Sequence, residues 1–194
     1  RAVKVSGLSH FPLGQPVPAK DHAVCVSLPT VKDLIGYEEK NSGTLAAMKS
    51  GYPRFVRNHI IQALVHHLEQ DDADRKHESF LFTKVADCEF FLSLYQIEAS
   101  ELDEKDGLFR LRLAQGSKDA KNCRLFQQHT GSSISSRFAE DFLFQKGVIA
   151  KRELVASSKV PASEKICKVI AKAHGPKIDA KDVLLANSGA NAFY

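Results

Sequence analysis

The sequence predicts a mixed α/β protein, and three observations carry that prediction. Apolar residues recur at three- and four-residue spacing over 57–70, which is typical of a helix with one buried face. Residues 108–114 alternate between two faces, as the side chains of a strand do. Residues 80–86 and 184–190 each resemble an apolar strand followed by a polar turn and the start of a helix, and a predicted helix precedes each of them.

The first part of the chain is predicted to be an arm. Prolines and glycines in residues 1–20 favour an extended segment without regular structure. The β-branched content of 22–28 predicts a strand, and Pro29 ends it. Thr30 is a candidate N-cap for a helical turn at 31–35. A short helix at 45–49 and an extended stretch at 50–54 complete this part.

The remainder is predicted to mix helices and strands. The expected helices, in addition to 57–70, span 85–95 with Thr83 as cap, 137–145 with caps among 132–136, and 162–174. The expected strands span 79–82, 108–114, 122–126 and a buried one at 183–186. Charged residues predict a loop at 71–78, a polar stretch covers 98–107, and a linker is expected at 150–160. A turn at 187–189 and a helix start at 190–194 follow the last strand.

Composition excludes several classes of protein. Of 194 residues, 43% are hydrophobic and 26% charged, which is the globular range. The net charge of +4 is partly concentrated at 146–181, where aromatic residues that could stack on bases are missing, so no nucleic-acid partner is expected. The sequence has no signal-peptide pattern and no apolar run of membrane-spanning length. Four widely spaced cysteines in apolar settings are expected to be reduced core residues, which favours a cytoplasmic location.

Common catalytic and metal-binding motifs are missing from the sequence. His66 and His67 are adjacent, so their imidazoles diverge and cannot share a metal ion. No nucleophile elbow, phosphate-binding glycine loop or dinucleotide fingerprint is present. The carboxylate pair Glu38-Glu39 is typical of an exposed loop. We therefore assign no catalytic residue and no metal ligand.

Two segments have residues suited to an anion. Tyr52 and Arg54 are two residues apart in an extended stretch, so a hydroxyl and a planar cation point to the same side and could grip a phosphate. An ordinary surface pair is the alternative. In the second segment, Asn187-Ser188-Gly189-Ala190, the amides of a helix start and the Ser188 hydroxyl could hold a phosphate too.

Five segments together resemble the pyridoxal-phosphate enzymes of cysteine and methionine metabolism, and in particular the fungal-type branch of cystathionine gamma-synthase. The segments keep the order and approximate spacing of that branch and cover roughly a third of the chain. The resemblance lies in residues 22–30, 35–39, 51–55, 134–141 and 187–193.

The resemblance implies roles for the two anion-binding segments. Tyr52 and Arg54 match a pair that reaches from one subunit to the cofactor phosphate in its neighbour. Ser188, Gly189 and Ala190 match a Ser-Gly-Met turn whose amides bind the same phosphate, with Ala in place of Met. The family's Asn-Pro-Thr continuation is not kept. The family's Schiff-base lysine lies downstream of residue 194, so the chain alone is expected to be inactive.

The resemblance also implies a fold, a domain order and an activity. The expected fold is the incomplete start of a fold type I, aspartate-aminotransferase-like enzyme. Its parts would be an arm (1–56), an α/β insert (57–149), a linker (150–161) and the truncated start of the pyridoxal 5'-phosphate domain (162–194). The full protein would be a homo-oligomer, a dimer or tetramer, that joins O-acylhomoserine to cysteine by γ-replacement. A cystathionine lyase of the same family and a non-catalytic regulatory or oligomerisation module are the alternatives.

Overall fold

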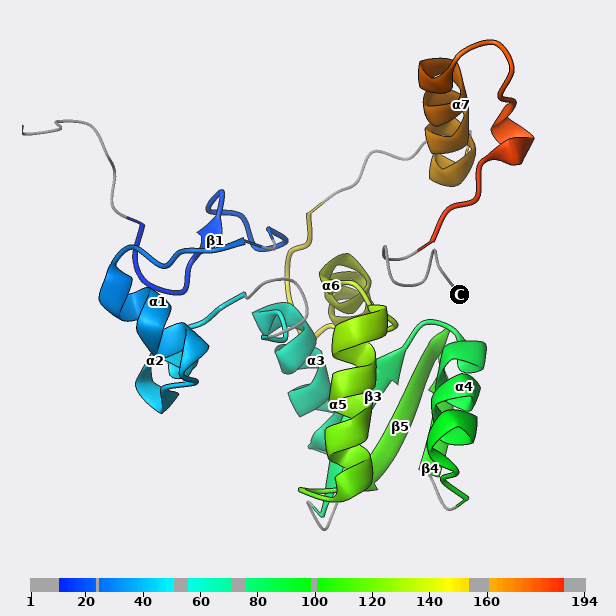
Figure 1. Ribbon diagram of the computed structural model, residues 1–194. Helices are drawn as coiled ribbons and strands as arrows, with labels where there is room; N and C mark the ends of the chain where they lie inside the picture. Colours follow the sequence, from blue (N-terminus) through cyan, green and yellow to red (C-terminus); the bar gives the residue numbers. More distant parts are fainter. Residues whose placement is uncertain are drawn as a thin grey trace, which may run out of the picture.

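The computed structural model describes residues 11–23, 25–50, 56–70, 76–98, 101–153 and 161–186 (Figure 1). Its helices and strands follow one another from an N-terminal arm, through a central sheet with helices, to a C-terminal helix. In chain order they are β1 (Pro16–Val17), β2 (Cys25–Val26), α1 (Val31–Glu38), α2 (Ser42–Ala46), α3 (His59–Glu69), β3 (His77–Phe82), α4 (Val85–Tyr95), β4 (Glu101–Lys105), β5 (Leu108–Ala114), α5 (Lys118–Thr130), α6 (Ser136–Gln145), α7 (Ala162–His174) and the 3-10 helix η1 (Ala180–Asp182).

The central sheet has three antiparallel strands in the order β3-β5-β4. Phe80 of β3 lies opposite Leu111 of β5, which fixes the register of that pair. Strands β4 and β5 form a hairpin that turns at Asp106 and Gly107, whose φ angles are 53° and 75°. A two-residue turn with both residues left-handed matches the twist of the flanking strands, and an Asp-Gly pair favours it.

Helices cover both faces of this sheet and form two cores. One core joins the phenylalanine-rich face of β3 and β5 to α4 and α5; its buried residues are Phe80, Phe82, Cys88, Phe91, Leu111, Leu113, Ala120, Cys123 and Phe126. The other joins the opposite face to α3 and α6; its buried residues are Ile60, Ile61, Leu64, Val65, Leu81, Leu108, Ile134, Ala139, Phe142 and Leu143. The prediction of a mixed α/β protein is confirmed, with an antiparallel sheet between two helical layers.

Most of the predicted helices and strands are present. The helices expected at 57–70, 85–95, 137–145 and 162–174 correspond to α3, α4, α6 and α7, and the strands expected at 79–82 and 108–114 correspond to β3 and β5. Thr30 caps α1 in a capping box with Asp33, and Ser135 caps α6. The N-cap of α4 is Lys84 rather than Thr83, and it makes no side-chain cap bond.

The strand predicted at 122–126 is wrong, because these residues lie within α5. The helix begins after Ser117, whose hydroxyl accepts a hydrogen bond from the Ala120 amide, and it ends at the left-handed Gly131. Its buried residues recur at helical rather than alternating spacing, so Cys123 and Phe126 share the inner face while Leu125 lies outside. The side chain of Gln127 then donates to the carbonyl of Leu81, which ties the helix to β3.

The polar stretch at 98–107, for which no strand was predicted, contains one, since residues 101–105 form β4. Every residue of this edge strand is exposed, so its sequence has no alternation of apolar and polar residues that would reveal it. Cross-strand charge holds it instead: Arg112 of β5 lies 2.8 Å from Glu101 and 3.2 Å from Asp103. Such pairs of opposite charge across a ladder stabilise a sheet modestly.

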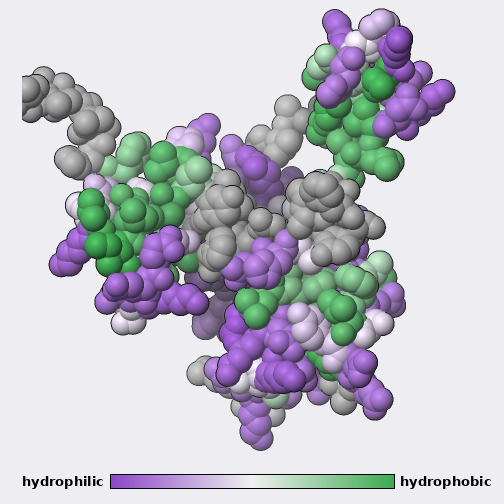
Figure 2. All heavy atoms as spheres, viewed as in Figure 1, coloured by the Kyte–Doolittle hydropathy of each residue, from purple (hydrophilic) through white to green (hydrophobic). Residues whose placement is uncertain are grey.

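The buried strand predicted at 183–186 is not formed. Leu184 is 94% exposed, and no strand within the described residues pairs with this stretch. The similarity between 80–86 and 184–190 therefore does not extend to structure over the part that is described. Apolar side chains show at the surface over α7 and, at the other end of the molecule, over the arm with α1 (Figure 2).

The arm is more ordered than its sequence indicates. Residues 16–17 and 25–26 form the short antiparallel pair β1-β2, which includes part of the stretch expected to lack regular structure and part of the strand expected at 22–28. The expectation that all four cysteines are core residues holds for Cys88 and Cys123 only. Cys25 is exposed and Cys167 is partly exposed, because neither lies on the central sheet or its covering helices.

Candidate functional site

The residues predicted to bind the cofactor lie outside the described part of the chain. This applies to Tyr52 and Arg54, and to Ser188, Gly189 and Ala190. The structure does describe the residues on both sides of the first pair. The candidate site is therefore the set of contacts that fixes the two ends of residues 51–57.

Both ends of that segment attach to the same short stretch of backbone. On one side, buried Ser50 donates its hydroxyl to the carbonyl of Ala23 at 2.9 Å. On the other side, the Nδ2 of Asn58 donates to the carbonyl of Asp21 at 2.9 Å. Asn58 also caps α3, because its Oδ1 accepts from the Ile60 amide at 2.9 Å. Residues 21–23 thus hold the entry and the exit of the segment.

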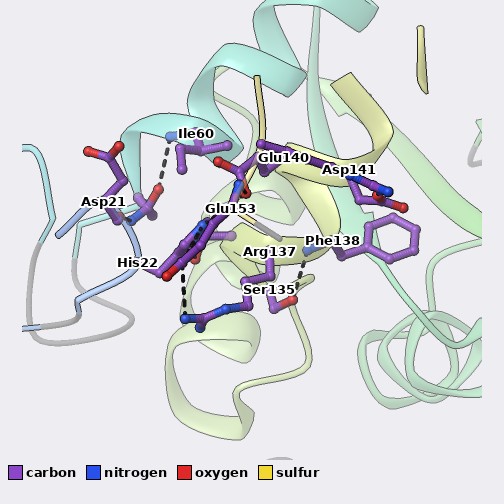
Figure 3. Close-up of polar contacts among 12 residues, drawn as sticks. Asp21, His22, Ile60, Ser135, Arg137, Phe138, Glu140, Asp141 and Glu153 are labelled. Carbon is purple, nitrogen blue, oxygen red and sulfur yellow. Dashed lines mark hydrogen bonds and ion pairs between the residues drawn. The ribbon is translucent and has the colours of Figure 1, made fainter. Parts of the chain in front are cut away.

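Between those two anchor points, the side chain of His22 reaches helix α6 (Figure 3). Its Nδ1 lies 2.9 Å from the hydroxyl of Ser136, in the first turn of the helix. Its Nε2 lies 3.1 Å from Oε2 of Glu140, one turn further along. The side chain is 4% exposed and that of Glu140 is 14% exposed. Both ring nitrogens are therefore satisfied in a nearly dry setting.

The same carboxylate organises the chain that follows α6. Oε2 of Glu140 accepts from the Glu153 amide at 3.0 Å, and the Glu153 side chain lies 3.6 Å from the His22 Nε2. Arg137 donates to that second carboxylate at 3.3 Å. One turn along α6, Asp141 pairs with Arg152. Two carboxylates thus face one edge of the imidazole, and a guanidinium balances part of their charge.

A serine, a histidine and a carboxylate in contact raise the question of nucleophilic catalysis. A general base must reach the reacting group, directly or through one water. The His22 ring has both nitrogens engaged and is almost fully covered, so it is not positioned to accept a proton from a substrate. The arrangement is suited to holding two parts of the chain together.

A second cation lies next to the predicted phosphate-binding segment. Burial lowers the pKa of Arg57, and the nearby carboxylates of Glu78 and Glu69 oppose this effect. Its guanidinium lies over the Phe80 ring, 5.9 Å from the centroid, a distance at which a cation is attracted to the ring. Arg57 is thus directed into the α/β unit, where it joins the start of α3 to the sheet.

The buried thiols are not suited to nucleophilic chemistry. Burial raises the pKa of Cys88 to about 11, and it raises the pKa of Cys123 further. A thiolate, not a thiol, is the nucleophile, so both are inert near neutral pH. Over the described ranges, no cluster of His, Cys, Asp or Glu is arranged to hold a metal ion. None of the helices described is both long enough and apolar enough to cross a membrane.

The contacts of His22 were not predicted from the sequence. His22 begins one of the five segments that carry the family resemblance, and Ser136 and Glu140 lie in another. Shared membership of the resemblance is the only signal that could have connected them. Because more than a hundred residues separate His22 from Glu140, no local pattern links the two.

Comparison with known proteins finds relatives among enzymes. An L-2-amino-4-chloropent-4-enoate dechlorinase/desaturase of Streptantibioticus cattleyicolor is 32% identical over 179 residues, which is 92% of this chain and 35% of the relative. The cystathionine gamma-synthase of Neurospora crassa is 48% identical over 54 residues, 27% of this chain and 9% of the relative. That of Saccharomyces cerevisiae is 28% identical over 183 residues, 76% of this chain and 27% of the relative.

The chain thus spans about a third or less of the length of these relatives. No protein-family model matches the chain. No solved structure matches it either.

Proposed function

Since this chain is homologous to cystathionine gamma-synthase-like enzymes, we propose that it forms the N-terminal part of an enzyme that acts at the γ-carbon of an amino acid. The observation that carries this proposal is the set of named relatives. The name of the Streptantibioticus enzyme gives it a substrate with chlorine on carbon 4, which is the γ-carbon. O-acylhomoserine, the substrate expected from the sequence, carries its leaving group on the same carbon.

Within this chemistry, γ-replacement is the proposed reaction: the cysteine sulfur bonds to the γ-carbon, the Cγ–O bond of O-acylhomoserine breaks, the acyloxy group leaves as a carboxylate, and cystathionine forms. Two relatives are named for the synthesis of cystathionine, and this favours replacement. Elimination is the second candidate. The relative aligned over nearly all of this chain is named a dechlorinase and desaturase, and loss of a γ leaving group without replacement is closer to that name. A cystathionine lyase would fall in this second class.

Pyridoxal 5'-phosphate is the proposed cofactor, and when bound it would act as the electron sink for either reaction. Tyr52 and Arg54 would bind its phosphate from the arm of one subunit, and the amides of Ser188, Gly189 and Ala190 would bind it from another. A phenol and a guanidinium form a donor set that fits a phosphate dianion. The anchored ends of 51–57 support this role, because a binding segment with fixed ends loses less entropy when it engages its ligand.

The proposed enzyme is a cytoplasmic homo-oligomer, since one subunit supplies Tyr52 and Arg54 to a phosphate held by another. Residues 1–56 are its arm, 57–149 its insert, 150–161 a linker and 162–194 the start of a fold type I cofactor domain. A module that only regulates or oligomerises is the competing proposal. It requires no bound chromophore.

The test uses the natively expressed protein. Its intact mass and its absorbance between 300 and 500 nm are measured, and purified protein is incubated with O-acylhomoserine with and without cysteine. A species well above 21.4 kDa with a yellow chromophore and cysteine-dependent cystathionine formation supports γ-replacement. Product release without cysteine supports elimination. A colourless protein near 21.4 kDa refutes both.

The phosphate-binding assignment has a separate test in the longest natural form of the protein. Arg54→Ala removes a charge-assisted hydrogen bond, so the dissociation constant for pyridoxal phosphate is expected to rise roughly tenfold or more. Equilibrium dialysis measures it. Lys49→Ala is the matched control, because it removes a nearby cation without removing the guanidinium. Unchanged retention in Arg54→Ala would remove Arg54 from the site.

A further inference from the structure

We propose that His22 is a positioning residue, which fastens residues 21–23 to helix α6 and thereby holds in place the two carbonyls that accept hydrogen bonds from the two ends of the segment that carries Tyr52 and Arg54. The fastening rests on the contacts described above. Its consequence for the cofactor rests on the proposed function. His22 is distinct from the residues expected to touch phosphate, and it acts only through the backbone on either side of it.

The first step is that the arm has few other attachments. Within the described residues, β1, β2, α1 and α2 make close backbone contacts only with one another. Asn58 and His59 stand at the start of α3, so their contacts with Asp21 also tie the arm to the α/β unit. The His59 amide adds a hydrogen bond to the Lys49 carbonyl. The imidazole of His22 is what reaches helix α6, across a separation of more than a hundred residues.

The second step is that the contact between His22 and α6 fixes the orientation of the imidazole ring. Ser136 and Glu140 are four residues apart on α6, so they present a hydroxyl and a carboxylate along one face of the helix. A planar ring with one nitrogen at each edge bridges that pair in one orientation. Ala139, between them in sequence, is fully buried against α3 and the sheet, and this fixes the helix that carries both partners.

The third step connects the ring to the segment. The carbonyls of Asp21 and Ala23 flank His22 in sequence, and they accept the hydrogen bonds of Asn58 and Ser50. Peptide units are planar and short, so a shift of His22 relative to α6 moves both acceptors with it. The hydrogen bonds of Ser50 and Asn58, one at each end of 51–57, therefore depend on the position of one imidazole.

Hydrogen exchange in the full-length protein tests this directly. Two backbone amides report on the anchors: that of Lys49, which donates to Gly14, and that of His59, which donates to Lys49. His22→Ala is expected to speed their exchange by about tenfold or more, the effect of losing a hydrogen bond to a charged group. The amide of Leu111 in the central strand is expected to be unchanged. His66→Ala, at an exposed position on α3, is the matched control.

A milder substitution provides the test if His22→Ala does not fold. Ser136→Ala removes only the partner of Nδ1 at a position where alanine is well tolerated in a helix, and several-fold faster exchange of the same two amides is expected. His22→Asn, which keeps a hydrogen-bonding group near Nδ1, is expected to recover part of the protection that His22→Ala loses. Unchanged exchange in both His22→Ala and Ser136→Ala would overturn the proposal.

Cofactor binding separates this proposal from the function it rests on. If exchange at Lys49 and His59 accelerates and the Kd for pyridoxal phosphate rises with it, both stand. Faster exchange with an unchanged Kd upholds the positioning role of His22, and it removes the adjoining segment from the cofactor site.

Discussion

Replacing two adjacent residues of α5 distinguishes a helix from a strand at 122–126. Phe126 is 6% exposed, and its ring centroid lies 5.4 Å from that of Phe91 and 6.0 Å from that of Phe90. Phe126→Ala empties that space, and such a change costs about 3–5 kcal/mol in the free energy of unfolding. Leu125 is 48% exposed, so Leu125→Ala forfeits about half of a leucine's burial, roughly 1 kcal/mol. Alanine's helix propensity offsets a small part of this loss.

Urea unfolding followed by far-ultraviolet circular dichroism measures both changes. With a total stability of about 5–15 kcal/mol, the loss at Phe126 is expected to shift the midpoint strongly, and the loss at Leu125 only slightly. A strand at this position would place Leu125 beside Cys123 on one face and Phe126 on the other with Asn122 and Arg124. Equal losses, or a larger loss for Leu125→Ala, would refute the helical assignment.

Three further predictions follow from local geometry. Gly131→Ala is expected to lower the free energy of unfolding by about 1 kcal/mol, because the left-handed φ of 72° at the end of α5 strains a residue with a side chain. A denaturant midpoint equal to that of the parent protein would contradict this. The Lys146 ammonium, first through its hydrogen bond and then through its charge, lowers the pKa of Asp106. The Asp106 carboxylate therefore adds to folding stability above its pKa in the unfolded chain, and this stability is lost as the pH falls through its pKa in the folded protein. Lys146→Met is therefore expected to raise the Asp106 pKa in an NMR titration, and an unmoved titration would refute the contact. Finally, a thiol reagent at pH 8 is expected to label the exposed Cys25 in the folded protein. Cys88 is buried and its pKa is raised to about 11, so it is expected to react only after unfolding. Rapid labelling of Cys88 in the folded protein would contradict its burial.

Periodicity predicted the elements whose burial is one-sided and continuous. The apolar stripe of α3 and the alternation of β5 each arise from one buried face, so both can be recognised in the sequence. Strand β4 lacks such a face and was missed. The Asp-Gly pair at 106–107 is typical of a two-residue hairpin turn and would have predicted β4, but it was not used in the prediction.

The candidate site was predictable only in part. The phosphate-binding residues Tyr52 and Arg54 follow from residue type, spacing and resemblance, and they remain predictions because they lie outside the described residues. His22, Ser136 and Glu140 have no local pattern that marks them. A histidine among β-branched residues and a carboxylate on an amphipathic helix are each ordinary until the chain brings them together.

By itself, the sequence determined the class of the protein, the principal helices and strands, and the family to which it is homologous, because these depend on residue identity and on the order of residues along the chain. Only the tertiary structure decided between a strand and a helix at 122–126, because Cys123 and Phe126 are both buried in the core only if these residues form a helix. It also decided which distant segments meet. Contacts such as that of His22 with α6 arise from how the elements pack around the sheet, and packing is a property of the whole chain rather than of any stretch of it.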